Sequence, residues 1–187
     1  MLIGVYVEVV MKKLIVILLI SILFINGCSI SKTDELTNSE KFANEYEVDE
    51  DNSFEYISFD DLEDLFLGGT GLLFFGNSDC EWCINSAKVL NDIIKDEEIS
   101  LINYFNPTTL SSDKQDKVLY LINEEIEDIE IEKLWLPSLY VIVDGEIIAY
   151  SNDTLENISS DDLNDSEERK LLKKSYLKLI ELYKEQV

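Results

Sequence analysis

The sequence predicts an α/β fold in which a central mixed sheet is flanked by helices. Short apolar runs, typical of strands covered on both faces, alternate along the chain with longer segments whose apolar residues recur at helical spacing. An Asp-Gly pair at 144–145 separates two further apolar runs and predicts a β-hairpin. Since the alternation with helices favours parallel strands and the hairpin adds an antiparallel pair, the sheet should be mixed.

The first expected elements are two strands joined by a helix. Residues 54–58 form a short strand candidate. A helix is expected over 60–66, where Leu62, Leu65 and Phe66 share one face, and a glycine-rich turn ends it. The wholly apolar run 72–75 then predicts a central strand, because a strand buried on both faces needs no polar alternation.

A second helix and a third strand follow the central strand. Residues 80–95 place apolar side chains on one side of a helix. Ser78 or Asp79 is expected to cap this helix, because each offers a side-chain oxygen to the unpaired amides of the first turn. The apolar segment 99–105 predicts a buried strand that ends before Pro107.

The carboxyl-terminal half should hold two helices and the hairpin. A helix is expected over 113–126, and the paired strands of the hairpin are expected over 139–143 and 146–150. Residues 166–184 predict a closing helix with one apolar face. The expected order of elements is therefore β-α-β-α-β-α-β-β-α.

Composition excludes several classes of function. The 187 residues carry 39 acidic and 15 basic side chains, a formal charge of −24. This balance repels phosphate backbones and argues against nucleic acid as a partner. The chain contains no histidine, which removes Cys–His and Ser–His catalytic pairs and the imidazole ligands of most zinc sites.

The amino-terminal segment has the features of an export signal. Two lysines follow Met11, and the nearly unbroken apolar run 14–25 is too short to span a bilayer comfortably. The run ends in Gly27 and Cys28, which resembles a bacterial lipobox. The resemblance implies a signal peptide over 1–27, with Met11 as a possible true start, and a lipid on Cys28. The protein is then expected to be a cell-membrane lipoprotein with its domain on the extracytoplasmic face.

Two regions are expected beyond the signal peptide. Residues 28–53 are polar and acidic with few large apolar groups, so they predict a flexible tether that starts at the lipidated cysteine, although Phe42, Tyr46 and Val48 could form a short amphipathic element. Residues 54–187 carry all the expected strands and helices and form the folded domain.

Two cysteines stand three residues apart at the junction of the central strand and the second helix. Side chains at i and i+3 of a first helical turn lie close enough to form a disulfide. The helix amino terminus favours a thiolate on Cys80, because unpaired N–H groups and the macrodipole place positive charge there. Cys80 is the candidate nucleophile, and Cys83, one turn deeper, is the candidate resolving thiol.

The segments Leu72–Cys83 and Leu136–Glu146 resemble the thioredoxin family, and the resemblance covers residues 54–187. Among relatives, the chain is most similar to the thioredoxin-like bacteriocin transport accessory proteins. In the thioredoxin fold a cis-proline precedes the fourth strand and faces the dithiol, and Pro137 matches that position. The motif here reads Cys-Glu-Trp-Cys, and Leu136 replaces the commoner threonine or valine before the proline.

The resemblance implies a thiol–disulfide oxidoreductase that acts on secreted or surface proteins. Its partners would be protein thiols and disulfides together with an electron donor or acceptor, and it would need no cofactor and no metal. Trp82, Leu136 and Pro137 would contact the target. Trp82 could instead only shield the sulfurs, and Trp135 could line the target groove beside Pro137, whereas Tyr140 is expected mainly in the core.

Other interpretations of the cysteine pair remain open. A structural disulfide between Cys80 and Cys83 would close so short a loop that it would restrain little chain. Two thiolates are half of a tetrahedral zinc site, and no histidine completes it. A non-catalytic binding module of an export or surface complex, which keeps the fold without turnover, is the alternative function.

Overall fold

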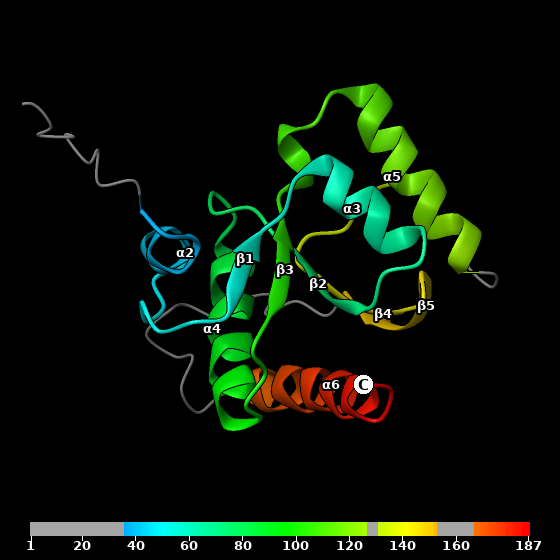
Figure 1. Cartoon of the computed structure of the whole chain (residues 1–187). Helices are drawn as coiled ribbons and strands as arrows, with labels where there is room; N and C mark the ends of the chain where they lie inside the picture. Colours follow the sequence, from blue (N-terminus) through cyan, green and yellow to red (C-terminus); the bar gives the residue numbers. More distant parts are fainter. Residues whose placement is uncertain (1–35, 127–130, 153–166) are drawn as a thin grey trace, which may run out of the picture. The chain divides into compact units, whose positions relative to one another are not determined.

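The computed structural model describes residues 36–126, 131–152 and 167–187, which belong to one compact unit. Its five strands form a single sheet in the order β1-β3-β2-β4-β5 (Figure 1). β1, β3 and β2 run parallel, β4 is antiparallel to β2, and β5 is antiparallel to β4. The expected mixed sheet is confirmed. The strands are β1 (Phe54–Tyr56), β2 (Gly71–Phe75), β3 (Ile102–Phe105), β4 (Ser138–Val143) and β5 (Glu146–Ser151).

Helices cover both faces of the sheet. The described helices are α2 (Asn38–Tyr46), α3 (Phe59–Phe66), α4 (Glu81–Asp96), α5 (Ser112–Glu125) and α6 (Glu167–Lys184), with a short 3₁₀ turn, η1 (Pro107–Thr109). Leu72 and Phe74 of β2 pack with α2, α4 and α6, whereas Leu73 and Phe75 pack with α3 and α5. All four side chains are fully buried. β2 is thus the central strand that its unbroken apolar run predicts.

Two element boundaries differ from the prediction for local reasons. β1 stops at Tyr56 because Ser58 caps α3 in a reciprocal capping box with Asp61. β3 starts at Ile102 because the chain before it completes the end of α4. Glu98 adopts a left-handed conformation there, and the Ile99 amide donates to the Ile94 carbonyl at 2.9 Å.

The structure corrects the flexible tether expected over residues 28–53, because α2 lies within it and packs into the core. Phe42 and Tyr46 are fully buried, and the Phe42 ring stacks on the Phe54 ring of β1 with centroids 3.8 Å apart. Ordering this mostly polar segment costs conformational entropy. The burial of two aromatic side chains offsets that cost. The compact unit begins at Leu36, and residues 28–35 lie outside the described residues.

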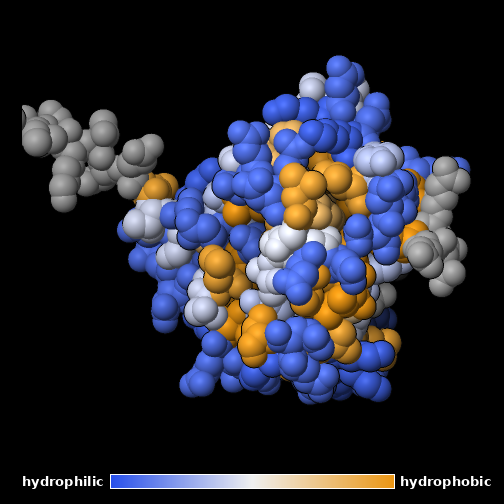
Figure 2. Space-filling view, turned by 45° about the vertical axis from the view of Figure 1, so that its right-hand side comes forward, coloured by the Kyte–Doolittle hydropathy of each residue, from blue (hydrophilic) through white to orange (hydrophobic). Residues whose placement is uncertain are grey.

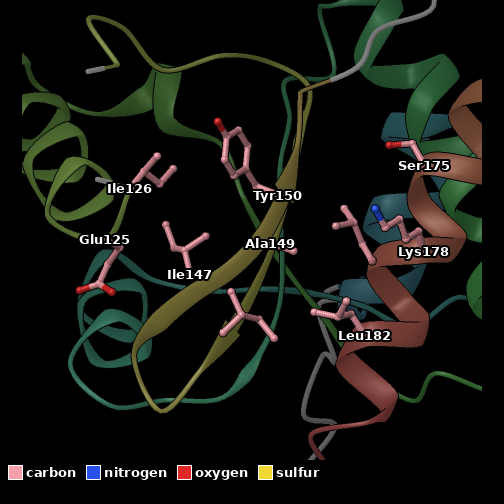
Figure 3. A pocket seen from close by; sticks show the side chains of 10 residues that line it. Glu125, Ile126, Ile147, Ala149, Tyr150, Ser175, Lys178 and Leu182 are labelled. Carbon is pink, nitrogen blue, oxygen red and sulfur yellow. The ribbon is translucent and has the colours of Figure 1, made fainter. Parts of the chain in front are cut away.

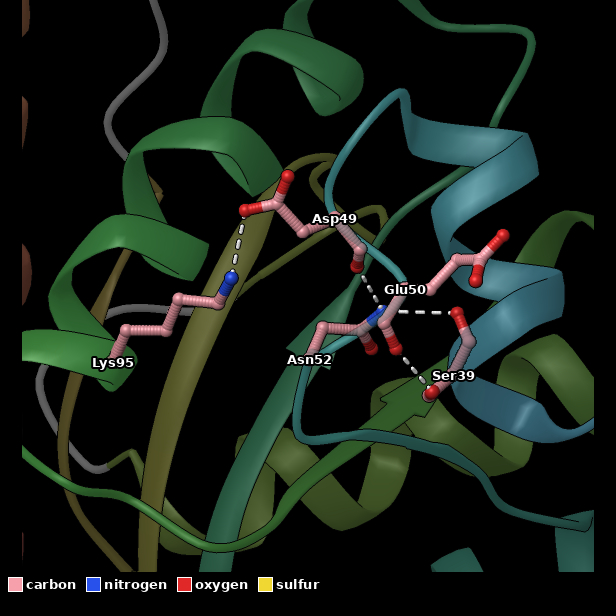
Figure 4. Close-up of polar contacts among 5 residues, drawn as sticks. All are labelled: Ser39, Asp49, Glu50, Asn52 and Lys95. Atoms are coloured by element: carbon pink, nitrogen blue, oxygen red, sulfur yellow. Dashed lines mark hydrogen bonds and ion pairs between the residues drawn. The ribbon is translucent and has the colours of Figure 1, made fainter.

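Polar contacts hold the segment between α2 and β1 in place (Figure 4). The Asn52 side-chain amide donates to the backbone carbonyls of Ser39 and Asp49, at 2.9 and 2.8 Å. The Ser39 hydroxyl donates to the Glu50 carbonyl at 2.5 Å, and Lys95 of α4 pairs with Asp49 at 2.7 Å. These contacts connect both ends of the segment to the folded unit, so α2 is part of the domain.

None of the helices among the described residues combines the length and apolar content needed to cross a membrane. The expected signal peptide over 1–27 and the expected lipid-bearing Cys28 lie outside the described residues.

Candidate functional site

The cysteine pair lies at the edge of the sheet where the parallel strands end. Phe75, the last residue of β2, is paired with Phe105 at the end of β3 and with Ser138 at the start of β4. The loop that follows β2 and the residues that precede β4 therefore meet at this edge. Ligand sites of α/β proteins commonly lie at the carboxyl ends of such strands.

A short turn leads from β2 into α4 and places Cys80 directly before the first residue of the helix, Glu81. The Asn77 side-chain oxygen accepts a hydrogen bond from the Asp79 amide at 3.0 Å, and the Asn77 carbonyl accepts one from the Cys80 amide at 3.0 Å. Cys80 is the N-cap of α4, without a side-chain capping hydrogen bond. The expected cap by Ser78 or Asp79 is wrong, because Asn77 organises the turn and Asp79 lies inside it.

The two cysteines differ in their exposure to solvent. Both are free thiols, and Cys80 is half-buried whereas Cys83 is completely inaccessible. Burial raises the pKa of Cys83 well above its ordinary value, and the neighbouring Cys80 side chain raises it further. A hydrogen bond from the Asn77 backbone offsets part of this shift. Cys83 is therefore protonated at neutral pH, and Cys80 is the sulfur that solvent and a target can reach.

Two buried tyrosine side chains, Tyr46 and Tyr104, belong to the same hydrophobic cluster as Cys83, and neither was among the predicted site residues. The Tyr46 hydroxyl of α2 donates to the Tyr104 hydroxyl of β3 at 2.9 Å, and Tyr104 donates a longer bond to the Gly76 carbonyl at 3.4 Å. Both rings belong to the same buried cluster as Cys83, and charges on Cys83 and on either tyrosine repel each other. Tyr46 was missed because α2 was interpreted as tether.

These tyrosines predict that the protein loses stability at alkaline pH. Burial is the main cause of the raised pKa of Tyr46, Tyr104 and Tyr140, and that of Tyr104 rises from 10.0 to about 12. The stabilising contribution of Tyr104 is complete below pH 10.0, the value expected in the unfolded chain, and is lost as pH rises toward about 12. Each such tyrosine should lower the free energy of unfolding by roughly 1.4 kcal/mol per pH unit in this window.

Urea unfolding between pH 8 and pH 12 measures this effect. Tyr104→Phe should flatten the alkaline decline relative to wild type, since the phenylalanine cannot ionise in the unfolded chain. An equal slope for the two proteins would contradict the predicted contribution of Tyr104.

The three residues expected to contact a target differ in their exposure to solvent. The peptide bond between Leu136 and Pro137 is cis, as the thioredoxin resemblance implies, and it directly precedes β4. Pro137 is buried, whereas Leu136 is half-buried and Trp82 remains 44% exposed. Leu136 also lines a cavity of about 220 Å³ next to η1. An exposed aromatic side chain beside Cys80 therefore accompanies a cavity of mixed polar and apolar lining at the same edge of the sheet.

The two other aromatic residues considered for the groove take different positions. Tyr140 is 2% exposed and packs against Phe75, which confirms its expected place in the core. Trp135 is 46% exposed, and the Lys133 ammonium lies 4.5 Å from its ring centroid.

A second cavity, of about 470 Å³, lies away from the cysteines. It is formed by β5, the end of α5 and one side of α6 (Figure 3). Figure 2 shows hydrophobic side chains interrupting an otherwise hydrophilic surface on one face of the molecule. Isoleucine and leucine dominate the cavity lining, and its charged members are Glu125 and Lys178. It holds no nucleophilic thiol, so the chemistry of the protein is better assigned to Cys80 and Cys83.

The described residues contain no group of three or more cysteine, aspartate or glutamate side chains that could hold a metal ion. Comparison with known proteins adds no assignment: no family model matches the chain, and none of the curated proteins is detectably similar to it.

Proposed function

We propose that this protein is a thiol–disulfide oxidoreductase of thioredoxin-like fold that acts on protein substrates through Cys80 and Cys83. The observation that carries the proposal is a half-exposed cysteine at the amino end of α4 followed, one turn later, by a fully buried one. The strand order, with the cysteines after β2 and a cis-proline before β4, supports the thioredoxin-like assignment.

Exchange at this pair needs only the two sulfur atoms and a target disulfide. The Cys80 thiolate attacks one target sulfur, forms a mixed disulfide and releases the other target sulfur as a thiolate. Cys83 then loses its proton and attacks the Cys80 sulfur. The internal disulfide forms, the second target sulfur leaves, and two electrons have passed from the dithiol to the target. The reverse sequence would oxidise a target dithiol, and an electron donor or acceptor restores the pair.

The surroundings of the dithiol suit an extended protein segment as substrate. Trp82 offers an exposed apolar surface beside Cys80, and Leu136 lines a cavity at the same edge. Aromatic and aliphatic surfaces of this kind bind protein side chains with little polar specificity. We assign target contact to Trp82, Leu136 and Pro137.

The proposal also includes a location at a membrane surface, which the sequence before the domain supports. The apolar run 14–25 followed by Gly27 and Cys28 supports export, cleavage and lipid attachment at Cys28. The proposal includes an extracytoplasmic domain anchored by that lipid, with substrates among secreted or surface proteins. Disulfides form and persist in such compartments, so a protein that exchanges them has substrates there.

Trapping of mixed disulfides tests the proposal. Cys83→Ser keeps the attacking thiol and removes the resolving one, so targets should remain covalently bound to Cys80 in cells. Captured proteins are released by reductant and identified by mass spectrometry. Cys80→Ser/Cys83→Ser is the matched control, because it presents the same surface without either thiol. Equal recovery from the two variants would reject the proposed function.

A further inference from the structure

The last strand of the sheet has one edge that faces away from the other strands. β5 ends the order β1-β3-β2-β4-β5, and β4 lies on its inner side. Within the parts of the chain that the structure describes, the backbone of residues 147–150 forms hydrogen bonds with β4 alone. Alternate residues of such a strand direct their N–H and C=O groups away from the sheet, where an added strand can pair with them.

The free edge of β5 is apolar rather than charged. Edge strands are commonly protected from pairing by prolines or charged side chains. The sequence of β5 is Glu-Ile-Ile-Ala-Tyr-Ser, so its one charged residue, Glu146, stands at the start. The register with β4 leaves Ile148 without a residue opposite it, as in a β-bulge, and the Ile148 side chain is 37% exposed. The middle of the edge therefore carries no charge that would keep another strand away.

The cavity of about 470 Å³ lies along this free edge (Figure 3). Four consecutive residues of β5, 147–150, line it, although neighbouring side chains of a strand point to opposite faces of a sheet. Ile126 at the end of α5 lies on one side of the strand, and Leu182 of α6 lies on the other. The cavity is thus a slot beside β5 with a helix on each side, which is the space that a further strand would occupy.

The two charged residues of this slot lie on opposite sides of β5. Glu125 belongs to the end of α5, and Lys178 belongs to α6 (Figure 3). Neither forms an ion pair with another described residue, whereas four other bases of α6 are each paired with a carboxylate. Those four are Arg169, Lys170, Lys173 and Lys184. In a chain with 39 acidic and 15 basic side chains, an unpaired lysine beside an apolar slot is available to a carboxylate of a partner.

We propose that the slot beside β5 binds an extended segment of a partner protein, which adds a strand to the sheet. Main-chain hydrogen bonds to residues 147–150 align the segment, and its apolar side chains pack on Ile147 and Leu182. A carboxylate of the segment pairs with Lys178, and a basic side chain on its opposite face pairs with Glu125. A second copy of this chain is a poor occupant, because two chains of charge −24 repel each other. The inference goes beyond the proposed exchange function, since no residue of the dithiol site lines the slot.

Selection from a library of cysteine-free peptides displayed on phage tests the proposal with the immobilised full chain. The enriched peptides should be rich in apolar β-branched residues and carry an acid and a base on opposite faces of the strand. Ile148→Lys should weaken their binding by about tenfold or more, because it places a charge on the apolar edge. Leu101→Lys is the matched control, since Leu101 is 47% exposed and lies outside the slot. Equal binding to these two variants would mean that the peptides bind elsewhere and would reject the proposal.

Reversal of the charge on α6 gives a second readout, which loss of folding would not produce. With Lys178→Glu, the selection should favour a base at the position where wild type favours an acid. Lys174→Glu makes the same change one turn earlier on α6, outside the slot, and should leave the selected sequences unchanged. The Cys80→Ser/Cys83→Ser protein should select the same peptides as wild type, because no thiol takes part. An unchanged charge preference in Lys178→Glu would contradict the proposed ion pair.

Three further outcomes would overturn the proposal. If no peptide is enriched over a surface without protein, the slot does not bind a strand. If wild type sediments as a dimer that Ile148→Lys dissociates, the slot is covered by a second copy of the chain. If dodecanoate binds to wild type but not to Ile148→Lys, and no peptide is selected, the slot holds an acyl chain instead.

Discussion

Cys80→Ser is expected to abolish catalysed disulfide exchange, lowering the rate by at least about 100-fold to the uncatalysed level. A serine hydroxyl does not form a mixed disulfide, so the first covalent step is lost. Cys83 cannot replace Cys80, because it is completely buried and burial raises its pKa above the neutral range. The half-exposed position of Cys80 at the start of α4 makes it the sulfur that a target meets first.

Turbidity from insulin reduction measures the reduction of target disulfides, and recovery of activity from scrambled ribonuclease measures their isomerisation. Cys83→Ser is the informative partner variant, because it should still form mixed disulfides but complete few turnovers. Cys28→Ser should retain wild-type activity in solution, since that residue is assigned only to the lipid anchor. If wild type shows no more activity than Cys80→Ser in both assays, the protein is better described as a non-catalytic binding module.

The dithiol and the sheet could be predicted from sequence because their signals are local. Cys80 and Cys83 lie within one turn of a helix that follows a continuous apolar strand, so a few consecutive residues contain the whole motif. The hairpin between β4 and β5 is likewise encoded by adjacent residues, and Asp144 and Gly145 both adopt the positive φ that the Asp-Gly pair predicts.

The tyrosine pair could not be predicted because it depends on contacts across the chain. Tyr46 and Tyr104 are 58 residues apart in sequence, and the hydrogen bond between them exists only after α2 packs on β1 and α4. Most residues between 28 and 53 are polar, so the composition of the segment indicates a tether. The packing of the segment depends instead on two aromatic residues, Phe42 and Tyr46, which are fully buried. A capping box at Thr37 is the local signal that could have indicated a helix.

Phe42→Ala should lower the free energy of unfolding by about 3–5 kcal/mol, the usual range for removing a buried phenylalanine. Phe42 is fully buried, and its ring stacks on Phe54 at 3.8 Å and on Tyr46 at 4.3 Å between centroids. Tyr104 meets it edge-on at 5.2 Å. Small domains have a total free energy of unfolding of only about 5–15 kcal/mol, so the loss of this one side chain would remove a large part of the stability.

The same substitution should affect the accessibility of Cys83, because Phe42 and Cys83 belong to the same buried cluster. As α2 loosens from the core, the cover over Cys83 opens, and alkylation of Cys83 in a Cys80→Ser background should become faster. Leu36→Ala is the control, since Leu36 precedes α2 and is 55% exposed, so it leaves no cavity. An unchanged unfolding midpoint together with unchanged Cys83 alkylation would mean that α2 does not pack on the sheet. Residues 38–46 would then be a tether, as their composition suggests.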